Sequence, residues 1–114
     1  MVYDPAGRII GANAPTERVA GYDRTGLTGL TFADVVDPAD VETERENFSR
    51  LASGELDYHD FHAIRHRSSG TTIDFAMHRV AVRHLDSSLA CVISVGRPVH
   101  LSHRIRDLIG VPAQ

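Results

Sequence analysis

The chain has 114 residues, of which 42% are hydrophobic and 24% are charged, and its formal net charge is −3. This composition suits one globular domain with an ordinary core, and no apolar run approaches the roughly 20 residues of a membrane-spanning helix. The mixed, mildly acidic charge pattern argues against nucleic-acid binding. The single cysteine, Cys91, excludes an intrachain disulfide, so we expect a cytoplasmic protein in a reducing compartment.

The N-terminal residues predict a short hairpin followed by small helices. Residues 4–7 read Asp-Pro-Ala-Gly, a turn sequence in which proline presets the second position and glycine suits the fourth. We expect the flanking strands at 2–3 and 8–10. Capping residues and glycine stops then predict short helices within 13–21, 23–29 and 31–36.

The longest helix is predicted from Asp37-Pro38 to Gly54, because aspartate is a good cap and proline fits the first helical position. Its apolar residues lie on one stripe, formed by Val41, Phe48, Leu51 and Ala52. Its charged residues are assigned to a solvent-facing side, formed by Glu42, Glu44, Arg45, Glu46 and Arg50.

The remaining residues predict three antiparallel strands, at 57–67, 71–84 and 89–97. Ser69-Gly70 suits a two-residue hairpin loop, which would pair Arg65 with Asp74. Keeping the later apolar residues on one face then requires a bulge near His78-Arg79. A longer loop or another bulge would swap the two faces. In this register the outer face includes Phe61, and the inner face carries His62, Ile64, His66, Ile73, Phe75 and Met77.

This order of elements predicts an α+β fold, in which short helices and one longer helix pack on one face of a five-stranded antiparallel sheet. The last strand is apolar on both faces, which indicates a central position or an outer face that needs a partner. Beyond it, a stripe of apolar residues at helical spacing predicts one of two structures. It is either a signalling helix or dimer contact, or a short helix that folds onto its own sheet. The stripe consists of Leu101, Ile105, Leu108 and Ile109.

These landmarks resemble the PAS domain family in their order and spacing. The matching stretches are 4–13, 19–22, 27–29, 37–40, 51–55 and 69–71. The resemblance implies a PAS domain over 1–99, with a short helix and linker to an effector domain at 100–114. It implies a non-enzymatic sensor module of a larger signalling protein, such as a two-component sensor kinase, a transcription regulator or a cyclic-dinucleotide enzyme. The sequence itself contains no recognisable catalytic motif.

The resemblance also bears on cofactors. Light-sensing flavin members carry a reactive cysteine in a helix, whereas Cys91 falls on the last strand. Oxygen-sensing haem members carry their axial histidine on the long helix, where this chain has Phe48, which cannot ligate iron. We therefore expect neither flavin nor haem, and haem held through His62 is the alternative left open. His62 and His66 are about 13 Å apart along a strand, too far to share one metal ion without another ligand.

We expect a homodimer that buries the outer sheet face or the tail, and an apolar pocket between the sheet and the helices for a small apolar or amphipathic ligand. A buried His62 would need a hydrogen-bond partner in that pocket. Two alternatives stay open: an interaction module whose full core binds nothing, and a small isomerase-like enzyme with a polar cavity. The expected pocket residues are Val19, Phe32, Val36, Phe48, Leu51, His62, Ile64, Phe75, Met77 and Ile93.

Overall fold

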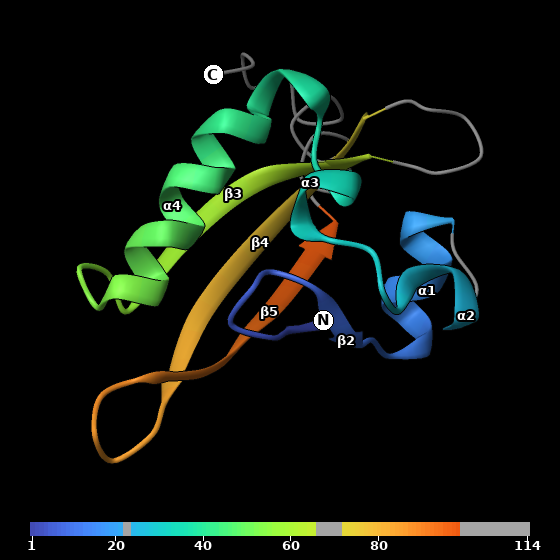
Figure 1. Ribbon diagram of the computed structural model, residues 1–114. Helices are drawn as coiled ribbons and strands as arrows, with labels where there is room; N and C mark the ends of the chain where they lie inside the picture. Colours follow the sequence, from blue (N-terminus) through green and yellow to red (C-terminus); the bar gives the residue numbers. More distant parts are fainter. Residues whose placement is uncertain (22–23, 66–71, 99–114) are drawn as a thin grey trace, which may run out of the picture.

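A computed structural model describes residues 1–21, 24–65 and 72–98 (Figure 1). Five antiparallel strands form one sheet in the order β2-β1-β5-β4-β3, and the helices cover one of its faces, which confirms the predicted α+β architecture. The strands are β1 (Val2–Tyr3), β2 (Ile9–Gly11), β3 (Tyr58–Arg65), β4 (Thr72–Arg83) and β5 (Leu89–Pro98). The helices are α1 (Ala14–Ala20), α2 (Arg24–Leu27), α3 (Phe32–Val35), the 3₁₀ helix η1 (Pro38–Asp40) and α4 (Val41–Ser53).

The turn between β1 and β2 is held by side-chain and backbone hydrogen bonds. Oδ1 of Asp4 accepts from the backbone N–H of Ala6 at 3.0 Å and of Arg8 at 2.9 Å. Gly7 completes the turn with φ +86°, a left-handed conformation that favours glycine. A Cβ atom at Gly7 would lie 2.7 Å from the ring of Phe32, so this turn packs directly against α3.

Capping residues determine where the long helix begins and ends. Asp37 accepts from the N–H of Ala39 at 2.9 Å, so Asp37-Pro38 starts the 3₁₀ turn, and α4 itself begins three residues later, at Val41. Gly54 follows α4 in the left-handed conformation, with φ +88°, as a glycine stop predicts.

The core beneath α4 is largely aromatic. Phe32 and Phe48 stack with their ring centroids 5.0 Å apart, and Tyr3 meets Phe48 edge-on at 6.1 Å. Both geometries are favourable arrangements of aromatic pairs. All three side chains are buried, so aromatic rings fill the space that α4 shares with the N-terminal strand.

The pairing of β3 with β4 differs from the predicted register. Arg65 pairs with Thr72 and Ala63 pairs with Asp74, so the predicted Arg65–Asp74 pair is wrong by two positions. The predicted loop at Ser69-Gly70 lies outside the described residues.

A second irregularity in this pairing changes the position of Phe61. The register shifts between Phe61 and Ala63, and Phe61 pairs with Met77. Both Phe61 and Met77 are buried, so the predicted placement of Phe61 on the outer face is wrong. In the predicted register Phe61 lies on the opposite face from Met77. The shift in pairing between Phe61 and Ala63 instead places Phe61 opposite Met77, on the inner face.

The predicted bulge at His78-Arg79 is also wrong. β4 and β5 pair without interruption from Phe75 to Val82, and the shift comes only between Val82 and Arg83. Because side chains alternate along this continuous ladder, Arg79 takes an inner position and is completely buried. Val80 and Val82 face outward and each is 38% exposed.

β5 occupies the middle of the sheet, between β1 and β4, which is one of the two positions that its apolar faces predicted. Its inner residue Val92 is fully buried, whereas Ile93 and Val95 are exposed on the other face. The β4–β5 hairpin extends beyond the other elements at the lower left of Figure 1. None of the helices in the described ranges is long and apolar enough to cross a membrane.

Candidate functional site

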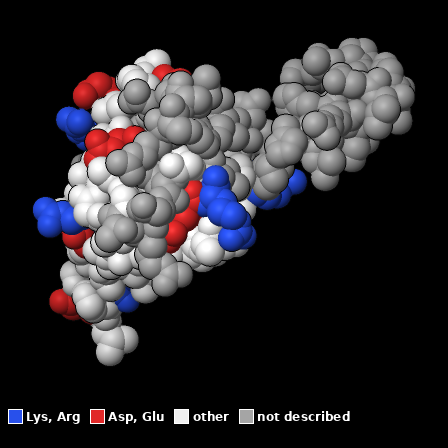
Figure 2. All heavy atoms as spheres, turned by 90° about the vertical axis from the view of Figure 1, so that its right-hand side faces the viewer, with Lys and Arg blue, Asp and Glu red and all other residues white. Residues whose placement is uncertain are grey.

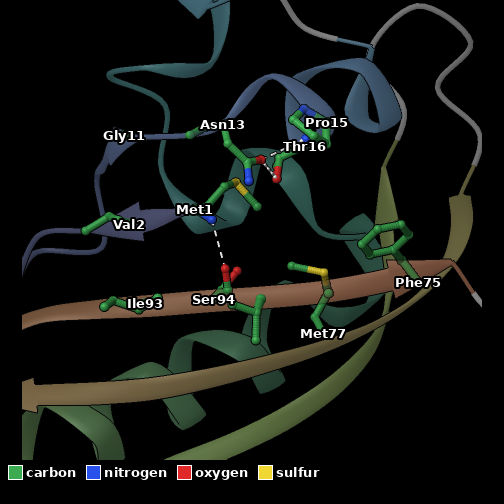
Figure 3. A pocket seen from close by; sticks show the side chains of 13 residues that line it. Met1, Val2, Gly11, Asn13, Pro15, Thr16, Phe75, Met77, Ile93 and Ser94 are labelled. Carbon is green, nitrogen blue, oxygen red and sulfur yellow. Dashed lines mark hydrogen bonds between the residues drawn. The ribbon is translucent and has the colours of Figure 1, made fainter.

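A cavity of about 640 Å³ opens beside β5 where the short strand β1 begins (Figure 3). This volume lies in the range of small-molecule sites. The polar side chains in its wall are Asn13, Thr16 and Ser94. Its apolar side chains come from the N-terminal residues, the start of α1 and the two central strands, and include Met1, Val2, Pro15, Phe75, Met77 and Ile93.

Gly96 allows two of these apolar side chains to lie across β5. Met77 pairs with Gly96 in the β4–β5 ladder. A Cβ atom at Gly96 would lie 2.1 Å from Sδ of Met77 and 2.6 Å from the ring of Phe75. Since real Cβ atoms do not make such contacts, the missing side chain gives Met77 and Phe75 the space from which they line the cavity.

The polar groups of the cavity differ in how they are satisfied. The N-terminal ammonium of Met1 donates to the carbonyl oxygen of Ser94 at 2.8 Å, and burial lowers the pKa of this ammonium. Oδ1 of Asn13 accepts from the N–H of Thr16 at 3.1 Å and from its hydroxyl at 2.6 Å, which caps α1. The hydroxyl of Ser94 is buried and has no hydrogen-bond partner among the described residues.

A charged cluster lies deeper in the core, between α4 and the sheet. Nη1 of Arg79 donates to Oε2 of Glu44, and Nε2 of His59 lies 3.1 Å from the same carboxylate oxygen. His59 is the cross-strand partner of Arg79. The guanidinium carbon lies 4.1 Å from the centroid of the Phe61 ring and 5.3 Å from that of Tyr3, within the range of cation–π attraction.

Opposing effects act on the carboxylate of Glu44. Burial acts to raise its pKa, but the hydrogen bond with His59 and the charges of Arg79 and His59 outweigh burial, so the pKa of Glu44 lies below its ordinary value. Glu44 therefore stays ionised and paired, unlike an acid–base catalyst that is tuned toward neutral pH. The predicted placement of Glu44 on the solvent-facing side of the helix is wrong, because it is only 4% exposed.

The predicted pocket residues do not all line one cavity. Three of them line the cavity beside β5: Phe75, Met77 and Ile93. Val36 borders a smaller hollow of about 330 Å³ between α4 and β3. Three belong to the packed core: Phe32, Phe48 and Leu51. The side chains of the other three, Val19, His62 and Ile64, are not among those that the structure describes. The tail stripe also lies outside the described residues: Leu101, Ile105, Leu108 and Ile109.

Sequence reasoning missed Ser94, Gly96 and the Arg79 cluster. A signal for Arg79 was present, because it continues the alternate positions of Phe75 and Met77 on β4. The predicted bulge at His78-Arg79 masked this signal, because it keeps the later apolar residues Val80 and Val82 on the inner face instead. No comparable signal pointed to Gly96, because its role depends on the register between two strands.

Metal binding and surface charge add no second candidate. In the part of the chain that the structure describes, no group of three or more His, Cys, Asp or Glu residues could hold a metal ion. His78 and Asp60 form a partly exposed pair, with no third ligand of these types in that same part of the chain. On the face drawn in Figure 2, acidic and basic residues are interspersed.

Comparisons with known proteins agree with this fold. A family model described as "PAS fold" matches residues 1–104. The chain is similar to the PAS domain of a protein from Colwellia psychrerythraea, with 17% identity, a TM-score of 0.74, and coverage of 85% of this chain and 81% of that one. It is similar to the PAS-B domain of Drosophila melanogaster Cycle with bound ethylene glycol, with 13% identity, a TM-score of 0.71, and coverage of 85% and 95%.

A third similar structure is the N-terminal domain of a diguanylate cyclase with a PAS/PAC sensor from Marinobacter aquaeolei. It has 15% identity and a TM-score of 0.71, and the match covers 90% of this chain and 94% of that one. No curated protein matches the sequence. At these identities the structural likeness shows the fold, while the family match covers most of the sequence.

Proposed function

Because the chain belongs to the PAS family, whose members are sensory modules of signalling proteins, we propose that it senses a small amphipathic ligand in the cavity beside β5. The observation that supports this proposal is the cavity itself, which is walled by Met1, Phe75 and Met77 and has a polar group at Ser94. An apolar lining with few polar groups is typical of small-molecule sites.

The position of the cavity suits a sensor. Ile93, Ser94, Val95 and Gly96 all belong to β5, the last strand among the described residues, and residues 99–114 follow it in the sequence. A ligand that contacts β5 would therefore act on the segment that leads out of the domain. We propose that this segment passes the signal to an effector domain in a cytoplasmic signalling protein, and that any catalysis lies in that effector.

The proposed sensor uses neither haem nor flavin. Phe48, which stands where oxygen-sensing members carry their axial histidine, is buried and stacked on Phe32. Cys91 is half-buried on β5 and does not lie in a helix. The purified protein should therefore be colourless, and a Soret band or flavin absorbance that survives gel filtration would contradict this part of the proposal.

Thermal unfolding with a panel of six- to ten-carbon alcohols, ketones and carboxylic acids tests the proposed ligand site. A ligand that binds only the folded protein stabilises it in proportion to the logarithm of its concentration. We expect at least one member of the panel to raise the unfolding temperature in a saturable way. A wild-type protein that no member stabilises would overturn the proposal.

A homodimer is a second candidate function, and the outer face of the sheet favours it. Tyr58 pairs with Val80, and Val80 pairs with Ile93, so these exposed apolar side chains form a row across three strands. Val82 and Val95 extend the row on the same face. Contiguous exposed apolar residues commonly mark an interface. We propose that a second copy covers this face, with the tail stripe contributing. A concentration-independent monomer mass in light scattering would count against it.

A further inference from the structure

We propose that the cavity beside β5 recognises an acceptor oxygen of its ligand, such as a carbonyl or carboxylate oxygen, through the hydroxyl of Ser94. This inference rests on the proposed ligand site and specifies its chemistry. The ligand class is a small amphipathic molecule whose oxygen meets Ser94 and whose apolar part lies against Met77 and Phe75.

Ser94 is a buried polar group that lies in the cavity wall without a partner of its own. The residue is 2% exposed, and its Oγ has no hydrogen-bond partner among the described residues. Figure 3 shows the Ser94 side chain pointing from β5 toward Met1 and the cavity. Its backbone groups are already used, because the N–H and C=O both pair with Met1 at 2.8 Å. The hydroxyl is therefore the group that a ligand can satisfy.

The neighbouring polar groups lack acceptors rather than donors. Arg79 is the cross-strand partner of Ser94, and its Nε and Nη2 are buried without acceptors among the described residues. Glu44 already accepts from Nη1 of Arg79. Leaving buried donors unpaired is unfavourable. Arg79 does not line the cavity, so among these donors the hydroxyl of Ser94 is the one that a ligand oxygen in the cavity would pair with.

The other walls define the rest of the ligand. Phe75 and Met77 lie across Gly96, and Met1 and Pro15 complete an apolar surface. Asn13 and Thr16 are hydrogen-bonded to each other, so their polar groups are less available to a ligand than the hydroxyl of Ser94. A site with one hydroxyl donor next to an apolar surface suits the acceptor oxygen of a short-chain ketone, ester or carboxylic acid better than it suits a polyol or a sugar.

A matched pair of probes tests this inference: 2-octanone, and 2-methyl-1-octene, which replaces the carbonyl oxygen with a methylene group. Binding of each probe would be followed through the methyl NMR signal of Met77 in the wild type, in Ser94→Ala and in Ser49→Ala. Ser49 is exposed on α4 and serves as the control. We expect Ser94→Ala to weaken 2-octanone binding by about 5- to 10-fold, the usual effect of losing one hydrogen bond, and to leave the alkene unaffected.

The outcomes separate the two proposals. If Ser94→Ala binds 2-octanone as tightly as the wild type does, the ligand site stands and the role of Ser94 is overturned. If neither probe shifts Met77 in the wild type, the ligand site itself fails as well. Without a probe, Ser94→Ala should unfold at the same temperature as the wild type or a higher one, because it removes an unpaired hydroxyl. A fall of several degrees would show that Ser94 already has a partner, which also contradicts the inference.

Discussion

Arg79, at the middle of β4, is completely buried and donates to the carboxylate of Glu44 on α4. This contact links the longest helix to a central strand of the sheet. The rings of Phe61 and Tyr3 lie near the guanidinium, so the arginine is surrounded by aromatic side chains and one anion. Aromatic side chains and this ion pair lie in the core under α4, and the cavity of about 640 Å³ lies beside β5.

The contributions of Glu44 and Arg79 to the free energy of unfolding should be strongly coupled. We expect Glu44→Leu and Arg79→Met each to lower the free energy of unfolding by about 3–5 kcal/mol, because each leaves a buried charge without its partner. Glu44→Leu should cost more, since it also leaves Arg79 beside His59 with no anion. The double variant should lose much less than the sum of the two single variants, as urea unfolding in a double-mutant cycle would show.

A control for this cycle is Glu42→Leu on the same helix, where the side chain is 85% exposed. It should change the free energy of unfolding by less than about 0.5 kcal/mol. Additive effects of Glu44→Leu and Arg79→Met would mean that the two residues do not interact in solution.

The lowered pKa of Glu44 predicts a specific acid dependence. Because the folded protein holds this carboxylate at a lower pKa than the unfolded chain does, the unfolded chain binds more protons in acid. The resulting stabilisation is fully present above the ordinary glutamate pKa of about 4.3 and is lost as the pH falls from there through the lower folded value. Glu44→Gln should lack this component, whereas Glu42→Gln should keep it. Urea unfolding between neutral and acid pH would compare them.

Gly96→Ala should close part of the cavity. Its Cβ would collide with Met77 and Phe75, so we expect these side chains to move and the free energy of unfolding to fall by about 1–3 kcal/mol. Stabilisation by 2-octanone in thermal unfolding should be lost or greatly reduced. Gly11→Ala is the matched control, because Gly11 also lines the cavity but has nothing within 4 Å of an added Cβ. Equal probe binding by both variants would contradict this assignment.

A charge on the outer face should disrupt the proposed dimer. Val95 is 61% exposed on β5, so Val95→Lys should be tolerated by the monomer and should raise the dimer dissociation constant by at least about tenfold through burial of a charge. Leu85→Lys, in the hairpin beyond β4, is the control and should leave the dimer intact. Sedimentation equilibrium measures both variants. A wild type that stays monomeric, or a Val95→Lys variant that still dimerises, would contradict the proposal.

Local signals in the sequence predicted most of the elements. Asp4 and Gly7 fixed the first turn, and Asp37 and Gly54 bounded the helical segment that contains α4, because caps and turns depend on residues close together in the chain. The sheet register was less predictable. Arg65 pairs with Thr72 rather than with Asp74, and nothing local to Ser69-Gly70 determines that register.

The candidate site was harder to predict, for the same physical reason. Its residues come together only through pairing between strands, such as Met77 with Gly96 and Arg79 with Ser94. An arginine on the inner face also contradicts the usual preference for apolar residues there, and its burial depends on the carboxylate of Glu44. That partner lies 35 residues away in the sequence.

The ligand cavity is the central claim, and selective methyl labelling of methionine tests it most directly. The chain has two methionines, and both Met1 and Met77 line the cavity. Titration of the labelled protein with 2-octanone should shift the Met77 signal in a saturable way, with transfer of magnetisation from the bound probe to that methyl group. A Met77 signal that stays unchanged at the highest soluble concentration of the whole alcohol, ketone and acid panel would contradict the account.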